Sequence, residues 1–163
     1  MNFNFISKIT KKNVSILIFI TSLNVSFAQG FISETIQYDG LIREYSIYIP
    51  ESYDGTTDFP LLFNLHGGGG TIAFHIGITD MSSIADTANF ILVYPQARPD
   101  PSDENSYNWI SKVPGTFDDV PFFSLLIDTI ASNYQIDQNR IYACGYSLGG
   151  DMSFELACKL NSR

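Results

Sequence analysis

The chain has 163 residues, a formal net charge of −8 and 45% hydrophobic residues, an ordinary composition for a globular protein with one hydrophobic core. This acidic balance argues against nucleic acid or an anionic lipid surface as a partner. It does not restrict neutral or weakly charged substrates.

Residues 1–28 follow the three-part pattern of a secretory signal peptide. An apolar stretch, Val14–Ile20, precedes small residues that end at Ala28, and the basic start is formed by Lys8, Lys11 and Lys12. A permanent membrane span needs about 20 apolar residues, and this stretch is shorter. The alternative to a signal peptide is an amino-terminal anchor or a buried helix. We predict cleavage after Ala28 and a secreted domain, residues 29–163, that is extracellular or periplasmic and free of the membrane. Its net charge is −11, because residues 1–28 hold three lysines and no acid.

The first half of this domain alternates between strand-like and helix-like segments. Residues 34–39 and 43–50 alternate with period two around a turn at Asp39-Gly40, which predicts an antiparallel hairpin at a sheet edge. The apolar runs 59–67 and 90–95 predict strands buried on both faces. Between them, residues 80–89 predict a helix with Asp80 as its cap and with an apolar face formed by Ile84, Ala85 and Ala88.

The second half continues the alternation after a polar loop, residues 96–116. A helix is predicted after this loop, because apolar residues repeat at helical spacing: Phe123, Leu126, Ile130 and Tyr134. Asp118 and Asp119 suit the positive end of this helix, and Pro121 is tolerated in its first turn. Residues 140–145 predict a third buried strand, and residues 147–160 a final helix. The sequence therefore predicts an α/β fold with a mostly parallel sheet covered by helices on both faces.

The segment Gly145-Tyr146-Ser147-Leu148-Gly149 fits the pattern G-x-S-x-G between a predicted strand and a predicted helix. This context is typical of a nucleophile elbow, in which a sharp turn pushes the serine hydroxyl clear of the sheet. The flanking glycines are required because a side chain there would clash with the neighbouring strand or helix. Ser147 is therefore the predicted nucleophile.

The run Leu65-His66-Gly67-Gly68-Gly69-Gly70 ends an earlier buried strand. Acyl transfer needs two backbone N–H donors for the tetrahedral oxyanion. We expect one from Leu148, which follows the nucleophile, and the other from Gly68, with Gly69 as second choice. A phosphate-binding loop is the alternative, but no Lys-Ser/Thr follows the glycines.

Neither histidine of the chain has the position of a catalytic base. In this architecture the triad runs Ser, Asp or Glu, then His along the chain, whereas His66 and His75 both precede Ser147. We expect His66 to hold the glycine loop through its ring and His75 to be exposed or at a pocket rim. The base and its carboxylate are expected beyond Arg163, so residues 29–163 alone should be inactive.

From Arg43 to Leu160 the chain resembles the secreted polyhydroxybutyrate depolymerase and feruloyl esterase group of α/β-hydrolases. The matching segments include "REYSIYIP", "FPLLFNLHGGGG", "IADTANFILVYPQA", "YNWI" and "RIYACGYSLGGDMSFELAC". The resemblance implies an α/β-hydrolase domain truncated after the helix that follows the elbow. It also implies an ester substrate attached to a polymer: a hydroxyalkanoate polyester, or a feruloyl or acetyl group on polysaccharide. One departure is the glycine run, which is longer than the His-Gly-Cys/Ser/Thr usual in the group.

The sequence thus predicts a serine carboxylic-ester hydrolase that needs no cofactor or metal. A serine peptidase of the same fold and a non-catalytic binding module are the alternatives. Two aromatic residues are candidates for substrate binding, Tyr146 within the elbow and Trp109 in the polar loop. Trp109 has an equal alternative role, in which it anchors that loop to the body of the protein.

Overall fold

The computed structural model describes residues 30–109 and 118–161, so the predicted signal peptide and residues 110–117 lie outside it. The strands are β1 Gly30–Tyr38, β2 Leu41–Ile49, β3 Phe59–Leu65, β4 Ile91–Pro95, β5 Arg98–Asp100, β6 Asp103–Asn108 and β7 Ile136–Gly145. The helices are α1 Ile72–Thr79, α2 Ser82–Ala88, α3 Val120–Asn133 and α4 Leu148–Lys159. Within these ranges, no helix has the length and apolar character needed to cross a membrane.

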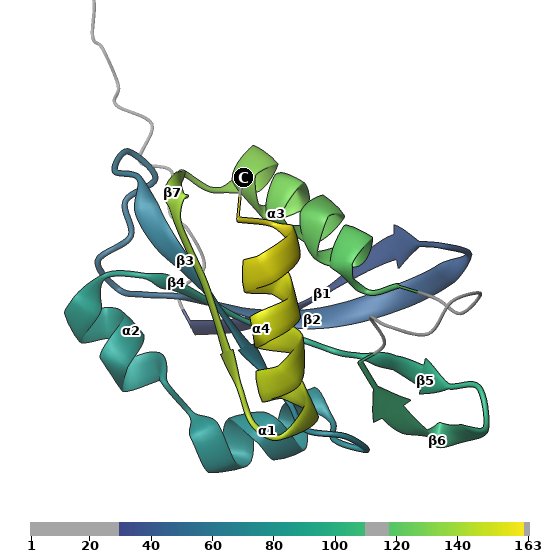
Figure 1. Ribbon diagram of the computed structural model, residues 1–163. Helices are drawn as coiled ribbons and strands as arrows, with labels where there is room; N and C mark the ends of the chain where they lie inside the picture. The colour runs from purple at the N-terminus through teal and green to yellow at the C-terminus, as the bar shows by residue number, and fades with distance from the viewer. Residues whose placement is uncertain (1–29, 110–117, 162–163) are drawn as a thin grey trace, which may run out of the picture.

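Five strands form the main sheet in the order β1-β2-β4-β3-β7 (Figure 1). β4, β3 and β7 run parallel, whereas β2 is antiparallel to both β1 and β4. The predicted hairpin at the edge is confirmed: Tyr38 pairs with Leu41, and Asp39 and Gly40 have φ of 49° and 76°. Positive φ at both central residues is the geometry of a two-residue turn that matches the twist of its strands.

Side chains of β4 alternate between two cores, one on each face of the sheet. Ile91 and Val93 belong to the larger core with α3 and α4, which lie in front of the strands in Figure 1. Leu92 and Tyr94 pack with Ala85 of α2 on the opposite face. All five residues are fully buried or nearly so. This is the two-sided burial that the continuous apolar run predicts for a strand inside a covered sheet.

Two predictions about the first helical region are wrong. Residues Ile72–Thr79, where no helix was predicted, form α1, whose first turn is capped by the Thr71 side chain accepting from the Phe74 N–H at 3.3 Å. This segment is apolar on nearly every side, so it carries no helical contrast between polar and apolar faces. In α2, Ala85 is buried, but Ile84 is 52% exposed and Ala88 is exposed as well, so the predicted apolar face is wrong at Ile84 and Ala88.

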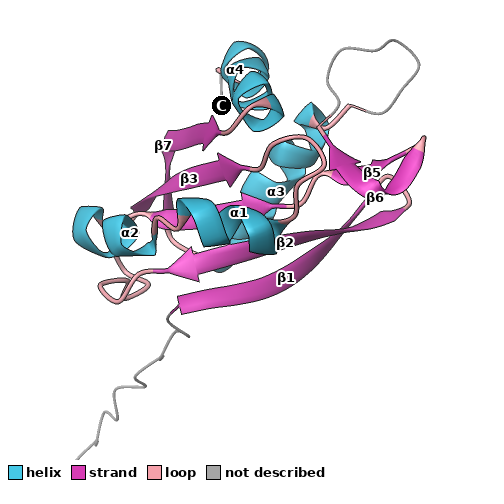
Figure 2. Ribbon diagram, turned by 90° about the horizontal axis from the view of Figure 1, so that it is seen from below, coloured by secondary structure: helices cyan, strands magenta, loops and turns pink. Residues whose placement is uncertain are grey.

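The predicted polar loop contains a second, two-stranded sheet. β5 and β6 pair antiparallel and project from one end of the main sheet, as Figure 2 shows. Most of their side chains are at least partly exposed, so no apolar alternation marks them as strands. β7 also begins at Ile136, earlier than the predicted Arg140, and its first half is polar.

A buried ion pair joins β2 to the start of α3. Arg43 Nη1 lies 2.7 Å from Asp119 Oδ1, and both side chains are almost fully buried. The second terminal nitrogen of Arg43, Nη2, donates to the Gln96 carbonyl at 3.0 Å. Asp118 has the predicted helix-end role, because its Oδ1 accepts from the Val120 N–H at 2.9 Å. Asp119 instead neutralises a buried arginine, which needs such a partner because an unpaired charge inside a protein is costly.

Candidate active site

Ser147 occupies a sharp turn between β7 and α4, with φ 51° and ψ −120°. Positive φ costs a non-glycine residue on the order of 1–3 kcal/mol and persists only where the surrounding structure imposes it. The Ser147 carbonyl accepts from the N–H groups of Gly150 and Asp151, at 2.8 and 3.1 Å, in the first turn of α4. The side chain is left exposed to solvent. This is the strained, exposed conformation that a nucleophile elbow requires.

Gly145 and Gly149 allow this turn to pack against the end of β3. A Cβ at Gly145 would lie 2.8 Å from the Leu65 carbonyl oxygen, and one at Gly149 would overlap the carbonyl oxygens of Leu65 and His66. The Tyr146 N–H donates to the same Leu65 oxygen at 3.1 Å. Because the obstructing atoms are backbone, they cannot move aside as a flexible side chain could. Both positions therefore require glycine.

The glycine loop, residues 67–70, follows β3 and lies beside the serine turn. A Cβ at Gly67 would lie 2.9 Å from the Tyr146 ring, and one at Gly68 would lie 3.5 Å from the Leu148 side chain. Gly69 has φ of 69°, in the left-handed region that favours glycine. The loop thus brings its backbone next to the residue that follows the predicted nucleophile.

His66 supports this loop with both ring nitrogens. Nε2 lies 3.0 Å from the Ala97 backbone N–H and 2.9 Å from the Gln96 side-chain amide, and Nδ1 lies 2.7 Å from the Gly67 carbonyl oxygen. A backbone N–H can only donate, so Nε2 must accept, and the ring proton is on Nδ1 and donates to Gly67. Burial lowers the pKa of His66, which favours this neutral form. A ring occupied in this way supports the loop and is not placed to act on Ser147.

The N–H groups of Gly68 and Leu148, which lie beside the turn, have no acceptor within residues 30–109 and 118–161. The Gly69 N–H, in contrast, donates to the Tyr107 carbonyl oxygen at 2.9 Å. The second-choice oxyanion donor is therefore already occupied. The N–H groups of Gly68 and Leu148, the first-choice pair, both remain available.

No protein-family model matches the chain. In sequence it is similar to a probable feruloyl esterase C of Aspergillus niger, with 29% identity over 119 residues that cover 71% of this chain and 41% of the relative. It is also similar to a bifunctional acetylxylan esterase/xylanase of Neocallimastix patriciarum, with 27% identity over 76% of this chain and 17% of the relative. The chain thus spans less than half the length of these curated relatives.

In structure the chain is similar to an acetyl xylan esterase from Aspergillus awamori, with a TM-score of 0.64 over 80% of this chain and 48% of that structure. The chain has the α/β-hydrolase fold. The sequence identity between the two is 15%, so this likeness carries the fold alone. The feruloyl and acetylxylan esterases are relatives by sequence, whereas a relation to polyhydroxybutyrate depolymerases is not among these findings.

Trp109 is buried in this α/β-hydrolase domain, with 5% of its surface exposed. Its indole N–H donates to the His66 carbonyl oxygen at 2.8 Å, and its ring lies 5.0 Å from the His66 ring and 5.5 Å from that of Phe123, between centroids. The anchoring role therefore agrees with the geometry better than stacking on a substrate does. Tyr146 is 65% exposed next to Ser147, so it remains the aromatic candidate for substrate contact.

The expectation for His75 is wrong. His75 is 2% exposed on α1, and its Nε2 lies 2.9 Å from Asn64 Oδ1 at the end of β3. Burial lowers its pKa, as it does for His66. In the described part of the hydrolase domain, neither histidine ring is hydrogen-bonded to Ser147.

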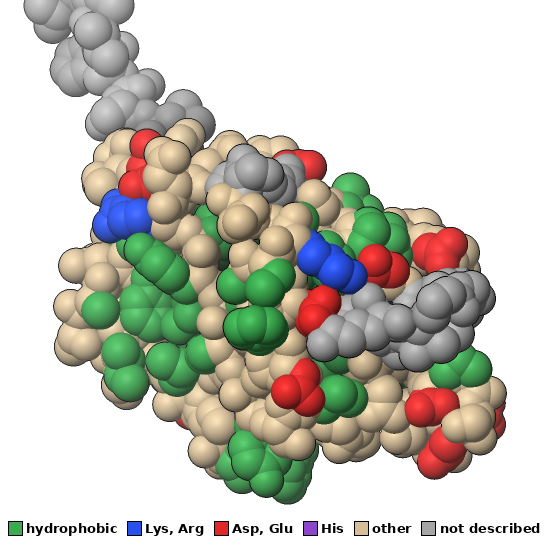
Figure 3. Space-filling model, viewed as in Figure 1, with side chains coloured by type: hydrophobic (Ala, Val, Ile, Leu, Met, Phe, Trp, Pro, Cys, Tyr) green, Lys and Arg blue, Asp and Glu red, His purple; other side chains and the backbone are tan. Residues whose placement is uncertain are grey.

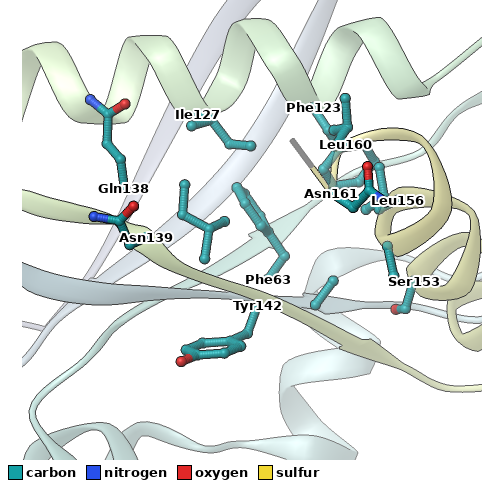
Figure 4. Close-up of a pocket in the computed structure, with 13 residues that line it drawn as sticks. Phe63, Phe123, Ile127, Gln138, Asn139, Tyr142, Ser153, Leu156, Leu160 and Asn161 are labelled. Carbon is teal, nitrogen blue, oxygen red and sulfur yellow. The ribbon is translucent and has the colours of Figure 1, made fainter. Parts of the chain in front are cut away.

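A pocket of about 400 Å³ lies between α3, α4 and β7, on the face shown in Figure 3. Figure 4 shows Phe63, Phe123 and Leu156 among the apolar side chains that line it. Ser147 and the glycine loop are not part of its lining, so this pocket is separate from the candidate site. It lies beside the edge of the described sheet, where Tyr142 of β7 is 54% exposed.

Two residues that support the glycine loop were missed by sequence reasoning. The Gln96 side chain donates to the Gly70 carbonyl at 3.1 Å and accepts from the Ile72 N–H at 2.9 Å. Asn108 Oδ1 accepts from the Gly69 N–H at 3.1 Å. Both lie in the segment that was predicted to be a polar loop. For Gln96, the sequence signal was an amide residue directly after an apolar strand, and this signal is too weak to assign a role. Asn108 ends a polar strand and gave no such signal.

Proposed function

We propose that the protein is a secreted serine carboxylic-ester hydrolase in which Ser147 is the nucleophile. The observation that carries this proposal is the strained, exposed conformation of Ser147 beside the backbone N–H groups of Gly68 and Leu148, for which the described residues provide no acceptor. These are the parts that acyl transfer needs: a projecting hydroxyl and a prepared site for negative charge.

In the proposed reaction the Ser147 oxygen attacks the ester carbonyl carbon and its proton passes to a general base. The carbonyl oxygen becomes an oxyanion, which accepts hydrogen bonds from the N–H groups of Gly68 and Leu148. Collapse of this intermediate expels the alcohol, which takes the proton back from the base, and leaves an acyl-enzyme. Water then releases the acid by the same steps.

We assign the base and its carboxylate partner to a histidine and an acidic residue beyond Arg163. Both histidines of the chain are buried and hydrogen-bonded to other groups. The order Ser, Asp or Glu, then His along the chain is that of the α/β-hydrolase triad.

The proposed substrates are feruloyl or acetyl esters of polysaccharide. The support is the similarity to proteins named feruloyl esterase and acetylxylan esterase. Exposed Tyr146, adjacent to the nucleophile, offers an aromatic surface against which an acyl or sugar group could pack.

Secretion is the remaining part of the proposal. It rests on the basic, apolar and small-residue regions of residues 1–28. We expect the exported protein to begin at Gln29. Amino-terminal sequencing of the protein from the culture medium or periplasm checks this, and an intact Met1 on the exported protein would contradict it.

A substrate panel and a covalent probe test the activity. The full-length protein should be labelled at Ser147 by a fluorophosphonate, as located by mass spectrometry of the labelled peptide. It should release ferulate from methyl ferulate or acetate from acetylated xylan faster than it degrades polyhydroxybutyrate or a peptide nitroanilide. Preference for the polyester would change the substrate class, and preference for the anilide would indicate a peptidase. Absence of both labelling and turnover would indicate a binding module.

A further inference from the structure

Four consecutive glycines make the proposed oxyanion loop the most flexible kind of backbone, yet an oxyanion hole works only if its donors are held in place beforehand. The order must therefore come from groups outside the loop. Three segments supply it: His66, Gln96-Ala97 and the residues Tyr107 to Trp109 of β6 and its end.

The peptide between Gly67 and Gly68 is fixed from one side. The Gly67 carbonyl oxygen accepts from His66 Nδ1 at 2.7 Å and from the Gly70 N–H at 3.1 Å. In a trans peptide the C=O and N–H groups point in opposite directions. Holding the Gly67 oxygen against His66 therefore turns the Gly68 N–H away from these groups.

The peptide between Gly68 and Gly69 is fixed by the β5–β6 hairpin. The Gly69 N–H donates both to the Tyr107 carbonyl oxygen at 2.9 Å and to Asn108 Oδ1 at 3.1 Å. Asn108 Oδ1 would also lie 3.0 Å from a Cβ at Gly68, so this oxygen packs against the Gly68 backbone. Gly68 is thus held between two fixed peptide planes.

The orientation of the Asn108 amide is set by Asp100. Asn108 Nδ2 donates to Asp100 Oδ2 at 2.8 Å, and the other Asp100 oxygen accepts from the Ser102 N–H and hydroxyl at 2.8 and 2.6 Å. Hydrogen bonds from Ser102 and Asn108 lower the pKa of Asp100, so the carboxylate is an acceptor only. The amide nitrogen of Asn108 must therefore face Asp100, and its oxygen must face Gly69.

We infer that Asn108, oriented by Asp100, is a positioning residue that fixes the glycine loop so that the Gly68 N–H serves as the oxyanion donor. This inference rests on the proposed function. It gives the β5–β6 hairpin a part in the reaction, because it supplies the group that orders the second peptide plane of the loop.

The test compares Asn108→Ala with Asn105→Ala in the full-length protein. Asn105 lies on the same strand and is exposed; its backbone N–H donates to Asp103 Oδ1, and its side chain makes no hydrogen bond within the described residues. Asn108→Ala should lower kcat for nitrophenyl acetate about tenfold to hundredfold, less than the about 10²- to 10³-fold cost of removing an oxyanion-hole donor outright. Inhibition by a trifluoromethyl ketone, which forms a bound oxyanion on Ser147, should weaken by a similar factor. KM should stay within about twofold, because the lost stabilisation acts in the transition state. Asn105→Ala should match the wild type in all three.

A second variant, Asp100→Asn, tests the amide orientation without removing bulk. Its oxygen can still accept from Ser102, but its nitrogen would face the Asn108 nitrogen. The Asn108 amide then loses its shorter hydrogen bond, to Asp100 at 2.8 Å, and keeps the longer one to Ser106 Oγ at 3.3 Å. We expect Asp100→Asn to lower kcat, as Asn108→Ala does. Fluorophosphonate titration should give the same number of active sites per protein as in the wild type.

The inference is overturned if Asn108→Ala keeps the wild-type kcat. It is also overturned if kcat per titrated site is unchanged and only the fraction of folded protein falls. Absence of turnover by the wild type would instead overturn the proposed function, and this inference with it.

Discussion

Replacing Ser147 by alanine in the full-length protein is expected to lower kcat for a nitrophenyl ester on the order of 10⁴- to 10⁶-fold. The alanine removes the serine hydroxyl from the turn at the end of β7, so no acyl-enzyme can form on this residue. Fluorophosphonate labelling should be lost together with turnover. The remaining rate, relative to water, would measure what the N–H groups of Gly68 and Leu148 and substrate binding contribute alone.

The matched control for this variant is Ser132→Ala. Ser132 is an exposed serine on α3 whose hydroxyl donates to the Thr129 carbonyl at 2.7 Å. It should keep full activity and labelling. If Ser147→Ala instead keeps more than about a tenth of the wild-type rate, Ser147 is not the nucleophile and the proposed mechanism is wrong.

Replacing Gly149 by alanine is expected to abolish activity and to lower the free energy of unfolding by about 3 kcal/mol, the upper end of the range for overpacking. The new methyl group would overlap the carbonyl oxygens of Leu65 and His66. Relief of this overlap requires α4 to move away from the end of β3. That movement carries Leu148 and its N–H with it, since Leu148 is the first residue of α4. Urea unfolding and ester turnover measure the two effects.

Gly77→Ala is the control for this second substitution. Gly77 also lies on a helix, α1, but, apart from its chain neighbours and the backbone of its own helix, no atom of the described residues lies within 4 Å of the Cβ position. Alanine there should leave activity unchanged and raise the free energy of unfolding by up to about 1 kcal/mol, since alanine is the better helix former. A Gly149→Ala protein that is as stable and active as Gly77→Ala would show that the elbow tolerates a side chain.

Features of short sequence range were predictable because their physical cause is local. The turn at Asp39-Gly40 needs positive φ at two adjacent residues, and asparagine, aspartate and glycine supply it at low cost. The two-sided burial of β4 follows from its continuous apolar run. The sharp turn at Ser147 was likewise predictable from five consecutive residues, because the turn requires glycine on either side of the Tyr146-Ser147-Leu148 segment.

Features that depend on the surroundings of a segment were predicted poorly. The α1 helix was missed because it is apolar on nearly all sides, and the β5–β6 hairpin because it is polar on both. His75 was expected at the surface, yet it is buried against Asn64. A single polar residue in a helix gives no sign of a partner on a strand that precedes it in the chain.

The sequence by itself determined the α/β class, the turn that carries Ser147 and the neighbourhood of the proposed oxyanion donors, because periodicity and glycine spacing act within one segment. Only the tertiary structure decided which donor is available. The Gly69 N–H is occupied by Tyr107 and Asn108, and the Gly68 N–H is not. That choice depends on hydrogen bonds between segments distant in the chain. Such bonds are fixed by how the sheet and hairpin pack together, and no spacing of residues along the sequence encodes them.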